Sequence, residues 1–142
     1  MTRMSQDEKQ RFLAGLHVGV LSLPQGERAP LTVPVWYDYT PGGELWFLTG
    51  PESRKGQLIR VGTRLSLCAQ TESPPYQYVS IEGVVTSLRP ADREKESRPM
   101  ARRYLGREMG DRYTDQDSAE ESVTVRVRPE RWLAVDYGKL QL

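Results

Sequence analysis

Two strand-like runs, residues 31–39 and 44–49, are separated only by the turn Pro41-Gly42-Gly43. Both runs are rich in β-branched and aromatic residues, and a Gly-containing turn between such runs predicts a β-hairpin. A hairpin joins antiparallel strands directly, whereas parallel strands need a long crossover connection. The hairpin therefore excludes a βαβ unit at this point and favours an antiparallel fold. Pro34 predicts an edge strand or a bulge, because proline cannot donate to a strand ladder.

Other segments of the chain also have strand patterns. Residues 63–70 alternate, with Leu65, Leu67 and Ala69 on one face. Gly83, inside a longer run, predicts a bulge or a place where a ligand approaches the backbone. We predict a loop at residues 24–30 and further strands at residues 17–23, 76–88, 123–128 and 132–137. These six or seven strands with tight turns predict a mainly β fold, an antiparallel β-barrel with peripheral helices.

Helix signals are fewer and lie outside these runs. Ser5 and Glu8 have the spacing of a capping box, which predicts a helix that stops near residue 15. Ser53 is positioned to cap a second helix directly after the break Gly50-Pro51. We also expect a charged helix over residues 90–105, kinked at Pro99, and a partly helical segment at residues 111–121. A length of 142 residues suits one domain, residues 1–142.

The bulk composition excludes several classes of function. The net charge is +1, from 20 basic and 19 acidic residues, so no global basic field favours nucleic acid or an anionic membrane. The single cysteine, Cys68, cannot form an internal disulfide, and the single histidine, His17, has no second ligand nearby in sequence, so we expect no metal site. No apolar run approaches the ~20 residues of a membrane span, and the first residues lack a signal-peptide core. We therefore expect a soluble, cytoplasmic protein.

A candidate anion site follows the strand at residues 45–49. Arg54 and Lys55 occupy the first turn of the predicted helix, where the helix dipole ordinarily favours acids. Beside the hydroxyl groups of Thr49 and Ser53, these two bases favour a phosphate. The alternative is an ordinary helix start with two exposed cations.

Aromatic residues near this stretch suit a planar phosphorylated ligand such as a flavin. They lie in Trp36-Tyr37-Asp38-Tyr39 and Tyr76-Gln77-Tyr78, although core and hairpin packing explains them equally well. No hydrolase or Walker motif is present in the sequence, and no catalytic residue is predicted.

Four segments in this order and spacing resemble the pyridoxamine-phosphate-oxidase-like split barrels, the flavin and deazaflavin oxidoreductase superfamily. They are Pro34-Val35-Trp36-Tyr37, Leu45-Trp46-Phe47-Leu48-Thr49, Ser53-Arg54-Lys55 and Val79-Ser80-Ile81-Glu82-Gly83-Val84-Val85. The resemblance implies a split β-barrel and a homodimer with cofactor sites at the subunit interface. It also implies that Thr49, Ser53, Arg54 and Lys55 bind the cofactor phosphate. The backbone of Val33, Pro34, Val35 and Trp36 would lie along the cofactor ring.

Within this superfamily, the chain looks more like the branch that uses coenzyme F420, a deazaflavin with an anionic tail. It lacks the Arg-bearing C-terminal segment of true pyridoxamine-phosphate oxidases and ends in Gly138-Lys139-Leu140-Gln141-Leu142. Arg60 or Arg64 is placed to meet the anionic tail. The resemblance implies hydride transfer from reduced F420 to an unsaturated or quinone-like substrate. The alternatives are an FMN-dependent oxidoreductase on the same fold and a non-enzymatic carrier of the cofactor or of haem.

Overall fold

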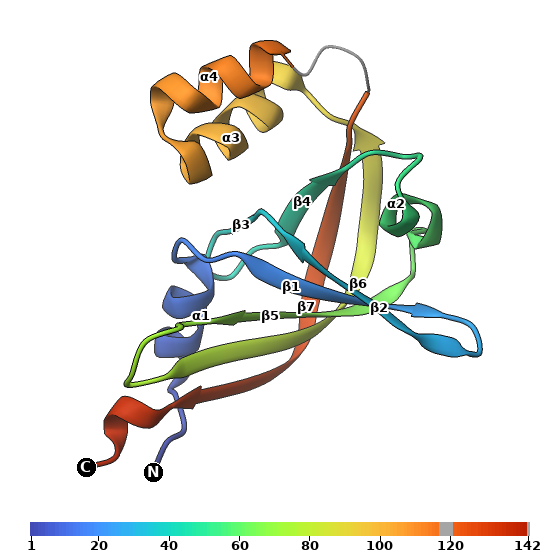
Figure 1. Cartoon of the computed structure of the whole chain (residues 1–142). Coiled ribbons are helices and arrows are strands. Elements are labelled where there is room, and N and C mark those ends of the chain that lie inside the picture. Colours follow the sequence, from blue (N-terminus) through green and yellow to red (C-terminus); the bar gives the residue numbers. More distant parts are fainter. Residues whose placement is uncertain (117–120, 142) are drawn as a thin grey trace.

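The computed structural model describes residues 1–116 and 121–141 and contains one seven-stranded antiparallel sheet (Figure 1). Its strand order is β2-β1-β5-β6-β7-β4-β3. This arrangement confirms the predicted mainly β, split-barrel class, and the sheet ends in two edge strands, β2 and β3. The strands are β1 (Gly19–Gln25), β2 (Arg28–Val35), β3 (Tyr37–Tyr39), β4 (Leu45–Thr49), β5 (Arg64–Gln70), β6 (Gln77–Pro90) and β7 (Val123–Asp136).

The run at residues 31–39 supplies both edges of the sheet. β2 pairs with β1, and β3 pairs with β4 through the predicted hairpin, so Trp36 alone separates the two edge strands in sequence. Pro34 therefore lies on an edge strand, as predicted. The loop expected at residues 24–30 is wrong. β1 and β2 extend into this segment and form a hairpin, whose turn contains Gly26 at a positive φ of 66°.

The last two strands predicted from the sequence are one strand. β7 runs without a break past Pro129 and pairs with β6 on one side and with β4 on the other. The predicted irregularity at Gly83 is confirmed, because the register of β6 against β7 shifts between Glu82 and Gly83. A Cβ atom at Gly83 would lie 2.5 Å from Cγ1 of Val127. Glycine therefore allows β6 and β7 to approach closely at the bulge.

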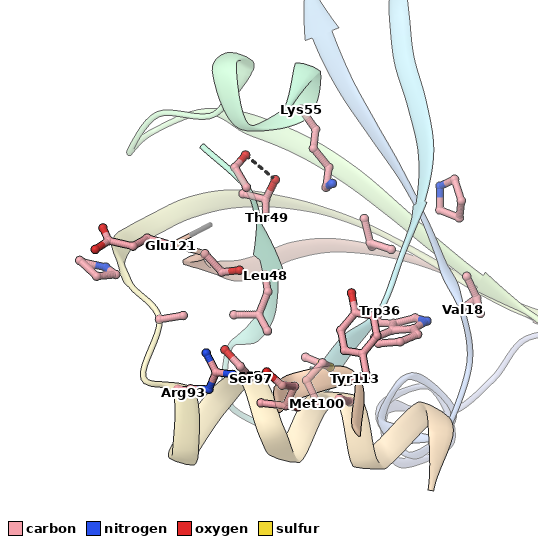
Figure 2. Close-up of a pocket in the computed structure, with 18 residues that line it drawn as sticks. Val18, Trp36, Leu48, Thr49, Lys55, Arg93, Ser97, Met100, Tyr113 and Glu121 are labelled. Atoms are coloured by element: carbon pink, nitrogen blue, oxygen red, sulfur yellow. Dashed lines mark hydrogen bonds between the residues drawn. The ribbon is translucent and has the colours of Figure 1, made fainter. Parts of the chain in front are cut away.

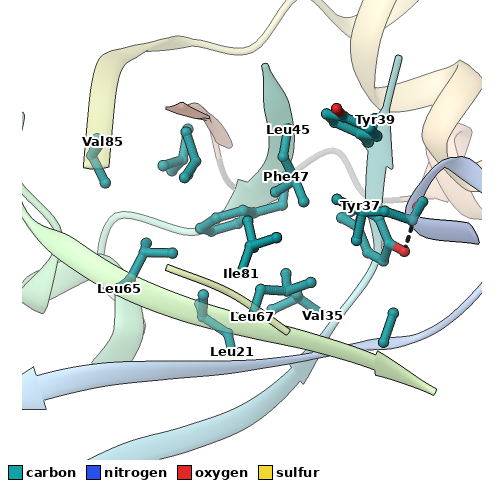
Figure 3. Close-up of a cluster of buried hydrophobic side chains, with 14 of the residues drawn as sticks. Leu21, Val35, Tyr37, Tyr39, Leu45, Phe47, Leu65, Leu67, Ile81 and Val85 are labelled. Atoms are coloured by element: carbon teal, nitrogen blue, oxygen red, sulfur yellow. Dashed lines mark hydrogen bonds between the residues drawn. The ribbon is translucent and has the colours of Figure 1, made fainter. Parts of the chain in front are cut away.

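The hydrophobic core is formed by the inward-facing residues of the strands (Figure 3). Leu65, Leu67 and Ala69 are all buried, as their alternation predicts. Tyr37 is also fully buried, and its hydroxyl donates a hydrogen bond of 2.7 Å to the carbonyl of Leu13 in α1 (Gln6–Ala14). The bond satisfies a polar group that would otherwise be costly to bury, and it ties α1 to the sheet.

Four α-helices accompany the sheet in the described part of the chain. The capping box at α1 is confirmed, and α2 (Arg54–Leu58) begins after the Ser53 cap. The predicted helix at residues 90–105 consists of a π-helical turn, η1 (Arg93–Ser97), followed by α3 (Arg98–Leu105), with Pro99 in the first turn of α3, where proline is tolerated.

The last of these helices, α4 (Arg107–Gln116), covers part of the predicted segment 111–121, of which residues 117–120 lie outside the described residues. α3 and α4 form a helical hairpin beyond one end of the sheet (Figure 1). A 3₁₀ turn, η2 (Tyr137–Lys139), follows β7. Across residues 1–116 and 121–141, no helix is both long and apolar enough to cross a membrane.

Candidate functional site

A cavity of about 1090 Å³ lies between the sheet and the helical hairpin (Figure 2). This volume lies at the upper end of the range of about 300–1,000 Å³ that is typical of small-molecule sites. One wall comes from the strands and the residues next to them and includes Val18, Pro34, Val35, Trp36, Leu48 and Thr49. The opposite wall comes from the helices and includes Arg93, Ser97, Met100, Ala101, Tyr113 and Thr114.

Lys55 extends from α2 toward this cavity (Figure 2). Its side chain is half-buried, and within the described residues it has no hydrogen-bond or ion-pair partner. A partly desolvated ammonium group without a protein partner is suited to bind an anionic group of a ligand. Lys55 therefore lines the cavity, and its predicted contact with a cofactor phosphate stays a prediction.

The other predicted bases point elsewhere. Arg54 donates a hydrogen bond of 2.8 Å to the side-chain oxygen of Gln25, near the β1–β2 hairpin turn. Arg60 donates to backbone carbonyls at the end of α2 and lines a neighbouring cavity of about 470 Å³. Arg64 pairs with Glu130 at 2.6 Å. None of the three side chains lines the larger cavity, so their predicted contacts with a cofactor stay predictions.

The hydroxyl groups of Thr49 and Ser53 have different roles. Ser53 Oγ donates to the carbonyl of Gly50 at 2.7 Å and accepts from the N–H of Gly56 at 3.1 Å, so its single proton is already engaged. Ser53 therefore builds the turn into α2. Thr49 Oγ1 lies 3.0 Å from Ser53 Oγ, and Thr49 itself lines the cavity. A Cβ at Gly56 would collide with the carbonyl oxygen of Gly50, so the turn requires glycine there.

Trp36 lies at the other end of the cavity from Lys55 (Figure 2). Its ring is stacked on Tyr104 of α3, with centroids 5.0 Å apart and an interplanar angle of 5°, and it is tilted against Tyr113 of α4 at 5.6 Å. The backbone stretch predicted to lie along a cofactor ring is only partly in the site. Pro34 joins Trp36 in the wall, whereas Val33 packs on the core.

Tyr104 fixes the helical hairpin to the sheet. Its hydroxyl accepts from the N–H of Tyr37 at 3.0 Å, and its single proton has the carbonyls of His17 at 2.6 Å and Tyr37 at 2.9 Å within hydrogen-bond distance. Burial raises the pKa of this hydroxyl, so it keeps its proton at neutral pH. Arg103 adds hydrogen bonds to the carbonyls of Ala14 and Gly15 at the end of α1. The stacked face of Trp36 is thereby held in a defined orientation.

The sequence gives no signal for the helical wall of the cavity. The sequence predicts a helix over residues 90–105 and a partly helical segment over residues 111–121, but nothing in their pattern indicates that Met100 and Tyr113 face a ligand site. Arg93, which donates to the carbonyl of Thr114, adds a second cation to this wall. The Tyr76–Tyr78 stretch, also considered from the sequence, lies at the start of β6 and lines neither cavity in the described chain.

Several solved structures share this fold. A conserved hypothetical protein of Mycobacterium tuberculosis has a TM-score of 0.79 at 24% identity, over 99% of this chain and 90% of that one. A structure named F420 reductase has a TM-score of 0.70 at 18% identity, over 87% of this chain and 94% of that one. An FAD-binding protein of Mesorhizobium loti has a TM-score of 0.68 at 23% identity, over 94% of this chain and 95% of that one. At these identities the likeness concerns the fold, which is that of the FMN-binding split barrels.

The family model described as pyridoxamine 5'-phosphate oxidase matches residues 5–136. Because this match covers nearly the whole chain, the protein belongs to that family. No curated protein matches the chain significantly. The family and the structural neighbours support an oxidoreductase-like role with a flavin-type or deazaflavin-type cofactor.

Proposed function

We propose that the protein is a cytoplasmic reductase that uses coenzyme F420 and acts on an unsaturated or quinone-like organic substrate. The observation that carries this proposal is Lys55, a half-buried cation without a partner in the described chain, aimed into the cavity opposite the ring of Trp36. A planar, phosphorylated cofactor has the two features that these two residues bind, an anion and a flat aromatic surface.

The residues present fit such a cofactor. Lys55 supplies a cation and Thr49 a neighbouring hydroxyl for the phosphate, while Pro34, Val35 and Trp36 form an uncharged wall for the ring. When bound, reduced F420 supplies the hydride. The protein binds and orients the cofactor and encloses its reactive face between the sheet and the helical hairpin, so that the substrate meets the ring in one geometry.

An FMN-dependent reaction is the second candidate. FMN has a phosphorylated ribityl chain like F420, so Lys55 and Thr49 serve either cofactor. The larger cavity adjoins the smaller one, because Thr49, Pro90, Glu121 and Ser122 line both. The smaller cavity offers Arg60 to the anionic tail that F420 has and FMN lacks, which favours F420.

We also propose a homodimer. In the pairing of the adjacent strands β2, β1, β5, β6 and β7, one residue from each strand lies directly opposite the next and forms a row on the solvent side of the sheet. None of these five residues is charged. The row consists of Pro34, Val20, Cys68, Ser80 and Leu133. Val20 and Leu133 are exposed large apolar side chains, with exposed fractions of 37% and 59%. An uncharged row across a sheet suits packing against a second copy.

The test is a pair of binding titrations of the purified protein, one with FMN and one with F420, followed through tryptophan fluorescence. Trp36 lines the cavity, so a bound ring is expected to quench its emission. Tighter binding of F420 than of FMN, together with oxidation of reduced F420 when a quinone is added to the protein, supports the proposal. Preference for FMN supports the second candidate. Binding of F420 without turnover of any quinone or enone supports a carrier, and binding of neither cofactor refutes both oxidoreductase functions.

A further inference from the structure

Tyr113 is a tyrosine of the helical wall whose hydroxyl is free in the described part of the chain. The hydroxyl groups of Tyr37, Tyr39 and Tyr104 each have a backbone partner. Tyr113 lines the cavity, and Figure 2 shows its hydroxyl directed into the cavity rather than along the helix. No hydrogen bond of this hydroxyl is found among residues 1–116 and 121–141.

The backbone that carries Tyr113 is firmly held. Gly110 packs against the backbone of Arg102, where a Cβ would come within 2.6 Å. Asp111 accepts hydrogen bonds of 2.7 and 3.0 Å from Arg102, and the buried hydroxyl of Thr114 donates to the carbonyl of Gly110. Residues on both sides of Tyr113 are therefore fixed to α3 or within α4. A polar group on such a rigid support loses little entropy when it binds a ligand.

The ring of Tyr113 is also positioned. It leans on Trp36 at 5.6 Å with an interplanar angle of 53°, and Trp36 is stacked in turn on the anchored Tyr104. Met100, which is 2% exposed, adds an apolar surface to the same wall. The Tyr113 hydroxyl is therefore a hydrogen-bond donor that lies beside flat and apolar surfaces.

We propose that the Tyr113 hydroxyl donates a hydrogen bond to a carbonyl oxygen of the acceptor substrate, and that the substrate is a flat aromatic compound bearing such a carbonyl. This inference rests on the proposed function, since it assigns a substrate class and a specificity-determining residue to the same cavity. The ring of Tyr113 and the side chain of Met100 bind the ring system of the substrate, next to the Trp36 wall that meets the cofactor ring. The hydroxyl selects oxygen-bearing rings over hydrocarbons of the same shape, because a site with a polar group discriminates against analogues that leave it unpaired.

The test compares two probes of nearly the same shape, menadione with two carbonyl groups and 2-methylnaphthalene with none. Their affinities are measured by calorimetry for the wild-type protein and for Tyr113→Phe, with and without saturating oxidised F420. We expect Tyr113→Phe to weaken menadione binding about 3- to 10-fold, as for loss of a neutral hydrogen bond, and to leave 2-methylnaphthalene binding unchanged.

Tyr76→Phe is the matched control. Tyr76 has the same exposed fraction as Tyr113, 50%, but lies outside both cavities, so its loss of a hydroxyl is expected to change neither affinity. The inference would be overturned if Tyr113→Phe weakened the binding of both probes equally or left menadione binding unchanged. It would also be overturned if the wild-type protein did not bind menadione. Failure of the proposed function is seen separately, as lack of F420 binding by the wild-type protein.

Discussion

Replacing Lys55 with methionine removes a cation from the wall of the cavity and keeps most of the side chain's apolar length. In the described structure Lys55 has no ion-pair or hydrogen-bond partner to lose, so we expect the free energy of unfolding to change by less than about 0.5 kcal/mol. The effect should appear in cofactor affinity alone. A hydrogen bond to a charged group contributes about 1.5–3 kcal/mol, and the half-buried position places Lys55 in the lower part of that range. A loss of about 1.5–2 kcal/mol corresponds to a Kd about 13- to 30-fold higher.

The assay is fluorescence titration of the wild-type and Lys55→Met proteins with the cofactor that the wild-type protein binds. Arg54→Met provides the control at the adjacent position, because Arg54 is bonded to Gln25 and lies outside the cavity. We expect this control to alter the Kd less than twofold. Equal losses in both variants would indicate a general charge effect, and an unchanged Kd in Lys55→Met would refute the assignment of the phosphate to Lys55.

Three further predictions concern stability. Gly110→Ala would place a Cβ 2.6 Å from the backbone of Arg102 and force α3 and α4 apart. The free energy of unfolding, measured by thermal unfolding, should therefore fall by about 1–3 kcal/mol. An unchanged Tm would contradict this close packing. Tyr37→Phe removes the hydrogen bond from the Tyr37 hydroxyl to a backbone carbonyl of α1 and should lower the Tm, measured by circular dichroism, by about 2–12 °C. A smaller change would mean that water replaces this hydrogen bond. Hydrogen bonds from Lys139, which is the largest cause, and from Ser5 lower the pKa of Glu8 from 4.5 to about 2, so their contribution to stability is complete above pH 4.5 and is lost as the pH falls toward 2. Lys139→Met should raise the pKa of Glu8 toward 4.5, measured by NMR titration, and no rise would refute the assigned cause.

Local patterns predicted much of the fold. The Ser5 and Ser53 caps and the alternation in β5 depend on neighbours only a few residues away, and all three are confirmed. The errors concern long-range pairing. Residues 24–30 contain proline, glycine and charges typical of a loop, yet pairing with a neighbouring strand extends β1 and β2 through most of them. Residues 123–128 and 132–137 were predicted as two strands, but β6 pairs with β7 on both sides of Pro129 and makes them one.

The candidate site was predictable only on its sheet side. Thr49 ends β4, Trp36 follows β2 and Lys55 lies in the first turn of α2, and the structure gathers these three residues around one cavity. The helical wall was missed because helix patterning shows which residues are buried within a hairpin and not which outside surface the hairpin faces. Arg54 could not be separated from Lys55 by sequence, since their different directions depend on the position of Gln25, 29 residues away.

The place of β7 in the sheet has a consequence for synthesis of the protein. β3 and β4 are joined to the other strands only through β7, which is the last strand in sequence and lies between β4 and β6. A growing chain therefore has two unconnected sheet fragments until residues 123–136 emerge. Thr49 belongs to one fragment and Pro34 to the other, so the cavity that both line is completed only after residues 123–136 have emerged. A cofactor that binds this cavity meets a finished barrel and cannot template the early strands.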